Sequence, residues 1–417
     1  MINRPQIRRS LVMLSLCLAG GTIFILPFLR EVYYIPMREA FGYSNTQMGV
    51  LNGVFGLFSL ATYFPGGWIA DRVSARRLMS AALAGCGLGG IYLSTLPTYG
   101  EALAIHAFWG VCCSLIFWNA MIKATRTWAS PQNQGFAFGL LESGRGIAEM
   151  LISTLLLTVF AWLGSSAESF SQIVLLLSGA NILVAIMMWV TLNDNHRHIQ
   201  SNHTTASAAQ EIRLIIQLPQ VWFIAFIVLS SYSAYWGTYY FAPYATEVLS
   251  ISIVASGAIG VARMWLKPAS AFCAGLIADR IGSTRTVLLF LSLTAASFSI
   301  LSTVPKTPDL MFFAMGLIVV ISIAVSSLRG VYFSMLEETN ISETSTGVVV
   351  GFVSMIGFSP DIFMPILGGY LLDRFSEGLG YRYYFGAIAM ICWAGVLIGF
   401  YFIRRSKISI FKAHNRS

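Results

Sequence analysis

Apolar stretches of about 20 residues, the length a helix needs to cross a bilayer, follow one another along almost the whole chain. Short polar turns separate them. These stretches predict twelve membrane-spanning helices, near residues 10–36, 46–66, 78–97, 101–122, 134–163, 169–192, 218–243, 250–274, 286–304, 309–333, 346–372 and 382–403. The 417 residues leave no room for a sizeable soluble domain beside these spans.

The composition agrees with a polytopic membrane protein. Hydrophobic residues make up 56% of the chain and charged residues 11%, whereas soluble domains carry about 25% charged residues. Disordered, fibrous and disulfide-scaffold proteins are therefore excluded, and a soluble enzyme is disfavoured. The six cysteines all lie in apolar stretches, where thiols behave as small hydrophobic groups. No nucleophile–base spacing, metal-ligand cluster or nucleotide-binding loop stands out, so we expect no enzymatic activity, metal or cofactor.

The most polar segment, residues 193–217, divides the spans into two sets of six. We predict an N-terminal six-helix bundle at 1–192, a cytoplasmic linker at 193–217 and a C-terminal bundle at 218–417 with a basic cytoplasmic tail. The linker holds three of the five histidines, namely His196, His198 and His203. Because no cysteine or acidic residue stands at ligand spacing from them, they favour a hydrated linker over a metal site.

The basic residues are distributed unevenly between the two sides of the predicted membrane, and this distribution indicates the topology. The formal net charge is +8, with 26 basic residues. If the N-terminus is cytoplasmic, most of these residues fall in cytoplasmic loops and tails, which is the positive-inside pattern. The basicity therefore indicates orientation and anionic headgroups, not nucleic acid, and we expect both termini in the cytoplasm.

An internal repeat supports two related halves. The sequence GGWIADRVSARR at 66–77 and the sequence GLIADRIGSTR at 275–285 share an Ala-Asp-Arg core. The aspartates of the two copies, Asp71 and Asp279, follow the second and the eighth predicted span. Repeats of this kind are typical of transporters built from two pseudo-symmetric halves.

At these residues the chain resembles the major facilitator superfamily over its full length. The loop signature of that superfamily, Gly-x-x-x-Asp-Arg-x-Gly-x-Arg-Arg, is matched in the first copy except that Ser74 replaces the second glycine; the second copy keeps Gly282 there. The stretches GGTIFILPFLREVYYIPM and GLLESGRG are similar to a little-characterised group of enterobacterial inner-membrane carriers. The resemblance implies an all-α membrane protein with twelve transmembrane helices in two pseudo-symmetric six-helix bundles, located in a bacterial inner membrane.

The Asp-Arg loops are expected to pair with neighbouring helix ends when the cytoplasmic side is closed and to release them when it opens. They predict a cytoplasmic gate made of Gly67, Asp71, Arg72, Arg76, Gly275, Asp279 and Arg280.

Apart from residues at the very ends of the spans, nine charged residues fall inside them: Arg30, Glu31, Glu142, Arg145, Glu149, Arg263, Lys267, Arg329 and Asp361. Each would cost about 2.5–3.5 kcal/mol if left in lipid, so intramembrane charges are functional candidates. They must pair with one another or line a wet cavity.

The acids are candidates for proton coupling. Glu142, Arg145 and Glu149 stand at i, i+3 and i+7 of the fifth span, on one helix face. They form either a proton-carrying site beside the pathway or a buried ion cluster that fixes the helix. Asp361 in the eleventh span is a further candidate. His106 in the fourth span occupies a position that is often arginine in the superfamily, and it either titrates or is simply hydrogen-bonded.

The bases are candidates for binding an anion. Arg263 and Lys267 lie one turn apart on the eighth span, where an anion or a distant carboxylate would relieve their repulsion. Arg329 has no acid within pairing distance along its own span. Arginine recognises carboxylate, phosphate or sulfonate with two parallel hydrogen bonds. With aromatic neighbours, the predicted substrate-binding set is Arg30, Tyr33, Arg263, Lys267, Arg329 and Tyr235. Alternatively, some of these bases reach an aqueous interface.

These observations predict a secondary active transporter for a small organic anion, driven by proton-coupled import or anion exchange, and functional as a monomer. One alternative is a proton-driven exporter of amphipathic compounds, and another is an importer of a larger anionic cargo such as a carboxylate siderophore. A transporter-like ligand sensor is the alternative from a different class.

Overall fold

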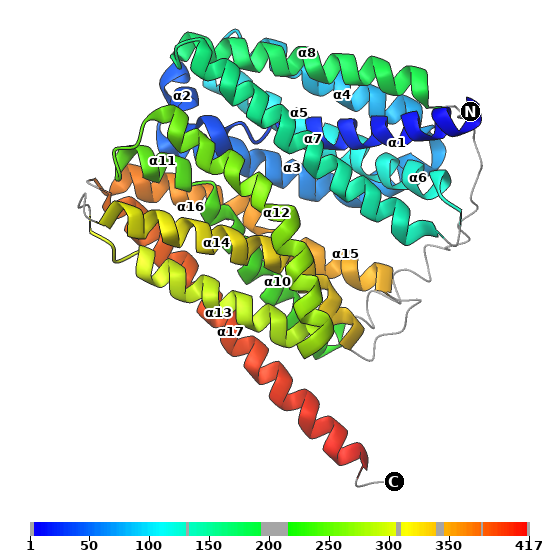
Figure 1. Ribbon diagram of the computed structural model, residues 1–417, viewed down its shortest axis with the longest axis vertical. Helices are drawn as coiled ribbons and strands as arrows, with labels where there is room; N and C mark the ends of the chain where they lie inside the picture. Colours follow the sequence, from blue (N-terminus) through cyan, green and yellow to red (C-terminus); the bar gives the residue numbers. More distant parts are fainter. Residues whose placement is uncertain are drawn as a thin grey trace. The chain divides into compact units, whose positions relative to one another are not determined.

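The computed structural model describes residues 4–130, 133–192, 216–305, 310–338, 346–376 and 378–414. This part of the chain is helical and contains no strand (Figure 1). Contacts divide the chain into two compact units. Unit 1 comprises residues 1–200 with 250–264, and unit 2 comprises residues 201–249 with 265–417. The predicted linker residues 193–215 lie outside the described part.

Unit 1 contains the helices that correspond to the first six predicted spans and the first part of a later helix. They are α1 (Arg4–Thr22), α2 (Arg30–Phe41), α3 (Asn45–Arg72), α4 (Ala75–Leu93), α5 (Tyr99–Val111), the π-helix η1 (Cys112–Trp118), α6 (Asn119–Trp128), α7 (Gln134–Trp162), α8 (Ala167–Thr191) and the beginning of α12 (Ile253–Ile281).

Unit 2 contains the remaining helices. They are α10 (Pro219–Thr238), α11 (Phe241–Glu247), the rest of α12, α13 (Ser283–Leu301), α14 (Met311–Val331), the short 3₁₀ helix η4 (Tyr332–Glu338), α15 (Thr346–Gly357), α16 (Pro360–Arg374) and α17 (Leu379–His414).

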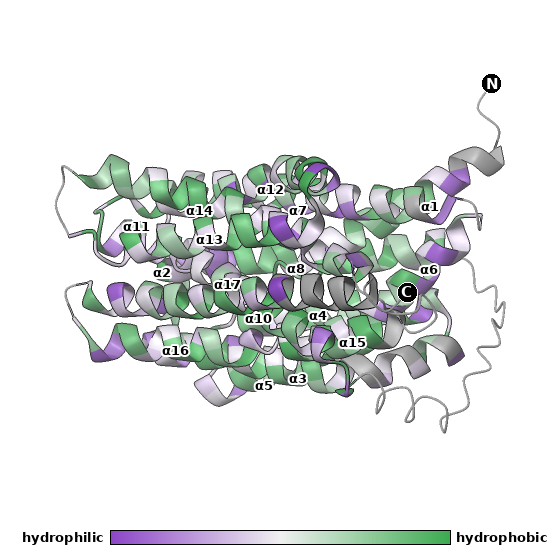
Figure 2. Cartoon of the chain, turned by 90° about the horizontal axis from the view of Figure 1, so that it is seen from below, coloured by the Kyte–Doolittle hydropathy of each residue, from purple (hydrophilic) through white to green (hydrophobic). Residues whose placement is uncertain are grey.

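Within the described residues, each of the twelve predicted spans is matched by one helix or by consecutive helical segments. Eight of these helical stretches are long and apolar enough to cross a membrane, and Figure 2 shows hydrophobic colour along most of the labelled helices. The other four are α1 with α2, α3, α4 and α12. Large exposed side chains such as Trp162 and Phe312 suit contact with lipid.

Side-chain caps explain where several helices begin. Ser44 and Gln47 form a capping box at the start of α3, and the Ser166 and Ser169 side chains form one at the start of α8. Such caps satisfy backbone N–H groups that the first helical turn leaves without partners. The starting points of α3 and α8 therefore follow from the local sequence.

The first predicted span is broken, which the apolar pattern did not predict. Residues 23–29 form turns between α1 and α2. Pro27 lies in this break, and proline cannot donate the backbone hydrogen bond that a continuous helix needs. The Asn52 side chain of α3 donates an amide hydrogen bond of 3.0 Å to the Pro27 carbonyl. A neighbouring helix therefore satisfies a backbone group in the break.

The eleventh span is broken as well. Phe358 and Ser359 separate α15 from α16, which starts at Pro360. The break places Asp361 in the first turn of α16. Discontinuous helices of this kind hold substrate and ion sites in many transporters.

Candidate functional site

Arg329 lies in the last turn of α14 and rests against aromatic rings of α10 in unit 2. Its guanidinium carbon is 4.1 Å from the ring centre of Tyr235 and 5.8 Å from that of Tyr232. At these distances the ring faces attract the cation. Arg329 is therefore held in place by aromatic groups, with its side chain only partly exposed.

Asp361 lies close to the same cation. The Trp236 indole donates a hydrogen bond of 2.8 Å to Asp361 Oδ1. Tyr232 also faces this carboxylate, and both Asp361 and Tyr332 are within electrostatic reach of Arg329. The sequence analysis assigned Arg329 and Asp361 to different roles; the structure brings them into one cluster.

Aromatic groups on α10 and at its C-terminal end complete this cluster. The hydroxyls of Tyr235 and Tyr239 share a hydrogen bond of 3.0 Å, and Tyr239 stacks on Trp236 with ring centres 4.9 Å apart. Tyr232 packs on Phe358 at the α15–α16 break. A fixed cation, a carboxylate and several hydroxyls thus stand together, and we call Arg329, Asp361, Tyr232, Tyr235 and Trp236 the Arg329 cluster.

Arg30 is buried in unit 1 directly after the break in the first span, with 1% of its surface exposed. Its guanidinium donates to Asn52 Oδ1 at 3.3 Å and to the Met48 carbonyl at 3.4 Å, and it lies 4.9 Å from the Tyr34 ring centre. The same Asn52 that satisfies the Pro27 carbonyl therefore also holds Arg30.

Tyr33 does not share this arrangement. It is 2% exposed, and its ring packs edge-on against Phe160 of α7 at 5.1 Å and near Phe170 of α8 at 6.3 Å. Its neighbour Tyr34 is the residue that contacts Arg30. The structure thus places Tyr33 among the apolar side chains of the interior of unit 1.

Arg263, on the part of α12 that belongs to unit 1, forms an ion pair with Glu31 of α2. Both side chains are less than a tenth exposed. Close backbone packing supports the pair, because a Cβ added to Gly260 would lie 2.7 Å from the Glu31 carbonyl oxygen. The distant carboxylate for Arg263 is therefore Glu31, which sequence alone could not identify across 232 positions. Lys267, one turn later, is half-buried in unit 2.

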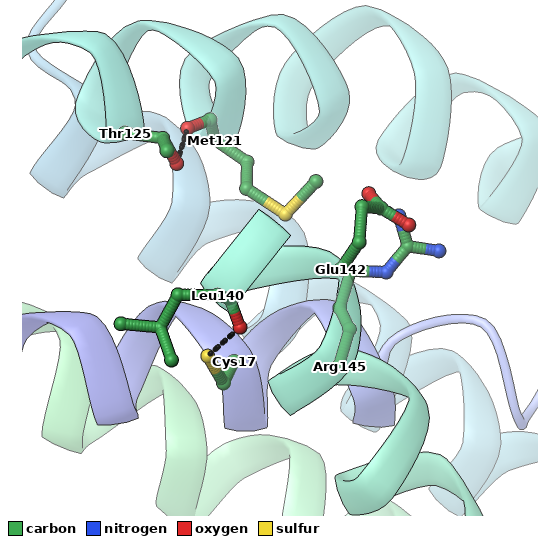
Figure 3. A network of polar contacts seen from close by, with 6 residues as sticks. All are labelled: Cys17, Met121, Thr125, Leu140, Glu142 and Arg145. Atoms are coloured by element: carbon green, nitrogen blue, oxygen red, sulfur yellow. Dashed lines mark hydrogen bonds and ion pairs between the residues drawn. The ribbon is translucent and has the colours of Figure 1, made fainter. Parts of the chain in front are cut away.

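The charged face of α7 lies against α1 and the end of the fourth span. Arg145 and Glu142 form an ion pair of 2.8 Å, and Figure 3 shows their side chains together. Arg145 also lies 5.2 Å from the Trp118 ring centre. Glu142 is 58% exposed whereas Arg145 is 17% exposed, and Glu149 is half-buried. Glu142, Arg145 and Glu149 stand on one face of α7, where the Glu142 side chain is exposed and the Arg145 side chain is shielded.

His106 lies in the interior of unit 1. It is 1% exposed, its Nδ1 is 2.8 Å from the Ala102 carbonyl, and its ring packs on Trp109. A carbonyl oxygen only accepts hydrogen bonds, so Nδ1 carries the proton. This placement favours the alternative in which His106 is simply hydrogen-bonded within its own helix.

The first Asp-Arg loop carries arginine–tryptophan contacts. The Arg72 guanidinium lies 3.8 Å from the Trp68 ring centre, and that of Arg76 lies 4.3 Å from the Trp189 ring centre. Lys123 donates to the Ala70 carbonyl at 2.6 Å, at the end of α3. Of the predicted gate residues, Gly67 and the side chain of Asp71 lie outside the described part.

The second loop is built differently. Asp279 and Arg280 are exposed and Gly275 is half-buried at the end of α12. The carboxylate of Glu338, in η4, accepts hydrogen bonds from the backbone N–H groups of Ser283 and Thr284 at the start of α13. Sequence analysis missed Glu338 because nothing local links it to a helix start some 55 residues away.

Comparison with known proteins agrees with this architecture. A family model described as Major Facilitator Superfamily matches residues 10–359 and 224–416. The chain is 29% identical to the inner membrane protein YihN of Escherichia coli over 399 residues, which cover 94% of each chain. It is 27% identical to the inner membrane protein YqcE of the same organism, covering 96% of each. The crystal structure of a bacterial homologue of the human lysosomal transporter Spinster superposes with a TM-score of 0.76 at 16% identity, covering 97% of this chain and 98% of the other.

Proposed function

We propose, for a chain that belongs to the Major Facilitator Superfamily of membrane transporters, that its cargo is a small organic anion. Family membership makes the chain a multi-pass membrane carrier for a small molecule and not an enzyme. The proposal on the cargo rests on one observation, the fixed cation of the Arg329 cluster. A carboxylate, phosphate or sulfonate is the complement of that cation.

The packing of Arg329 supports this role. A guanidinium that lies on an aromatic ring keeps its edge N–H groups available for an acid group. The Tyr235 ring lies against the guanidinium, and the hydroxyls of Tyr235 and Tyr239 share a hydrogen bond, so one hydroxyl of this pair can donate to an oxygen of an anion. The tyrosines therefore hold the cation and also offer polar contacts to a bound anion.

Asp361 provides a route to proton coupling. When ionised, it balances the charge of Arg329 and competes with an incoming anion. When protonated, it leaves Arg329 as an unbalanced cation, so anion binding and proton binding favour each other. We propose Asp361 as the coupling acid, which would give proton-coupled import, and keep Glu142, Arg145, Glu149 and His106 as secondary candidates.

Two other predicted substrate residues, Arg30 and Arg263, lie in unit 1 and have different roles in this proposal. Arg30 remains a candidate for substrate binding in unit 1. Its guanidinium is held at the break in the first span, in the same way that Arg329 is held near the break in the eleventh span. We propose that Arg263 acts through its ion pair with Glu31, which must change if α2 and the start of α12 separate during transport.

We further propose that both termini lie in the cytoplasm and that the protein functions as a monomer.

A ligand screen tests the cargo. Purified protein is heated with small carboxylates, phosphates and sulfonates, and the Tm is compared with that of Arg329→Gln. The matched control is Arg374→Gln, because Arg374 is an exposed arginine at the far end of α16. We expect one anion class to raise the Tm of the wild type and of the control but not of Arg329→Gln.

Other outcomes identify the alternatives. Stabilisation by lipophilic cations that persists in Arg329→Gln would contradict an anion carrier and support an exporter of amphipathic compounds. Stabilisation by bulky polycarboxylates alone would indicate a larger cargo such as a siderophore. Binding of an anion without any flux in proteoliposomes would indicate a ligand sensor.

A further inference from the structure

We propose that the acid bound by the Arg329 cluster is aromatic, and that Phe333 and Phe358 contact its ring while Arg329 binds its acid group. This inference rests on the proposed function, because it assigns the cargo of the same cation to a chemical class. It also adds two residues that carry neither charge nor hydrogen-bonding group, which a search for intramembrane charges does not identify.

Two phenylalanine rings continue the aromatic surroundings of Arg329. The Tyr232 ring, whose centre lies 5.8 Å from the Arg329 guanidinium carbon, packs on Phe358 with ring centres 4.8 Å apart. Phe333 meets Phe358 edge to face at 6.2 Å, and its ring centre is 4.8 Å from that of Tyr332. Tyr332 in turn interacts with Arg329. The two rings are therefore linked to the cation by direct contacts through both tyrosines.

Local structure holds the two rings in place. Phe358 lies at the break between α15 and α16, where its backbone N–H donates to the Ser354 carbonyl at 2.9 Å. Phe333 lies in η4, where the neighbouring Ser334 hydroxyl donates to the Ser283 hydroxyl at the start of α13, also at 2.9 Å. Side chains that are ordered before binding lose less freedom when a ligand arrives, which favours binding.

Their exposure distinguishes these rings from the core and from the lipid-facing surface. Core rings of unit 2 such as Phe298 and Phe385 are fully buried, whereas Phe312, which is suited to lipid contact, is 80% exposed. Phe333 and Phe358 are partly exposed, and they lie beside a base and an acid. Intramembrane charges face the interior of a bundle or a wet cavity, so rings beside them share that environment. A ligand that reaches the charges therefore also reaches these rings.

The chemistry of the rings favours an aromatic ligand over a saturated one. An aromatic ring has a negative face and a positive edge, so two aromatic rings attract each other in offset or edge-to-face arrangements. A saturated ring of the same size buries similar apolar surface but lacks this attraction. An aromatic carboxylate, phosphate or sulfonate would place its acid group on Arg329 and its ring on Phe333 and Phe358.

The test compares acids of equal charge and similar size. The purified full-length protein, held in a neutral detergent, is titrated by calorimetry with benzoate, benzenesulfonate and phenyl phosphate, and with the cyclohexyl analogue of each. The variants are Phe358→Leu and Phe333→Leu, which remove a ring but keep an apolar side chain. The control is Phe312→Leu, because Phe312 lies on the helix that carries Arg329, at its opposite end.

For at least one acid group, we expect the aromatic acid to bind about fivefold more tightly than its cyclohexyl analogue, as one aromatic pair contributes. The control should keep this preference, and both phenylalanine variants should lose most of it while still binding the acids. Unchanged Tm values without ligand show that the variants are folded. Because the two rings lie on different elements, one folded variant is sufficient for the test. Equal affinity for aromatic and cyclohexyl acids, or a preference that survives in every folded phenylalanine variant, would overturn the aromatic cargo.

Arg329→Gln separates this inference from the proposed function. If aromatic and cyclohexyl acids bind equally well and both are lost in Arg329→Gln, the anion site stands and only the aromatic class is wrong. If the acids bind as tightly to Arg329→Gln as to the wild type, the proposed anion site itself is contradicted, and the aromatic inference is contradicted with it.

Discussion

At the scale of single residues, the charged side chains inside the spans differ in what balances them. Arg263 is neutralised by Glu31, and Arg145 by Glu142. Arg329 instead rests on tyrosine rings with Asp361 nearby. Arg329 can exchange Asp361 for an anionic ligand, because the acid and the ligand compete for the same cation. A cation in a tight ion pair, such as Arg263, has a structural role until the pair is broken.

Asp361→Asn tests the coupling acid. An amide cannot change charge, so a gradient of one pH unit, which drives about tenfold accumulation with one proton per anion, should drive none in this variant. Exchange of internal for external anion should continue. The measurement is uptake into proteoliposomes with and without the pH gradient, and Asp373→Asn, at the exposed end of the same helix, is the control. Accumulation that survives in Asp361→Asn would move the coupling role to another acid.

Arg263→Gln tests the buried ion pair. Removing one partner of a buried pair costs about 3–5 kcal/mol, because the other charge is left without compensation. We expect a clear fall in Tm for Arg263→Gln and for Glu31→Gln alone. The double variant should recover part of the loss, since it leaves no lone charge. If the two single losses simply add in the double variant, the two residues do not act as a pair.

At the scale of elements, breaks in two spans place the key residues. Pro27 interrupts the first span just before Arg30, and Pro360 begins α16 just before Asp361. Close packing also depends on small residues at single positions: a Cβ on Gly21 of α1 would lie 2.6 Å from the Ala148 Cβ of α7. Such approaches are how helices associate in a membrane, where burial of apolar surface gives no preference for a protein neighbour.

Asn52→Ala tests the first break. The amide of Asn52 serves both the Pro27 carbonyl and the Arg30 guanidinium, and a buried polar group that loses its partner costs about 1–3 kcal/mol. We expect a lower Tm for Asn52→Ala. Asn133→Ala, at an exposed position before α7, should change it little. Equal Tm values for the two variants would show that the break is held by other contacts.

Glu338→Gln tests the difference between the two loops. In the first loop the Ser74 side chain caps its own helix by accepting from the Arg77 N–H, whereas in the second the cap is supplied by Glu338. Loss of the charge at a helix start should cost about 0.3–1 kcal/mol. Glu39→Gln, at an exposed position at the end of α2, should not. The measurement is Tm at low ionic strength; a response equal to that of Glu39→Gln would contradict the cap.

At the scale of the whole molecule, the chain is a carrier of the Major Facilitator Superfamily, and its span pattern agrees with that fold. The predicted bundle boundaries at 192 and 218 and the cytoplasmic position of both termini remain predictions. The asymmetry between the two loops is also a property of the whole chain. One half presents arginine–tryptophan pairs and the other a carboxylate-capped helix, although both carry the same repeated sequence pattern.

The sequence by itself determined the helical membrane fold, the approximate places of its helices, the repeated Asp-Arg loops and the family, because these depend on local hydropathy and on motifs of about a dozen residues. It also identified the charged residues that a membrane makes expensive. It could not say which of them meet: Glu31 and Arg263 are 232 positions apart, and Trp236 and Asp361 are 125 apart. Only tertiary packing decides such pairs, because a side chain far along the chain becomes a neighbour only when the helices that carry it are packed together.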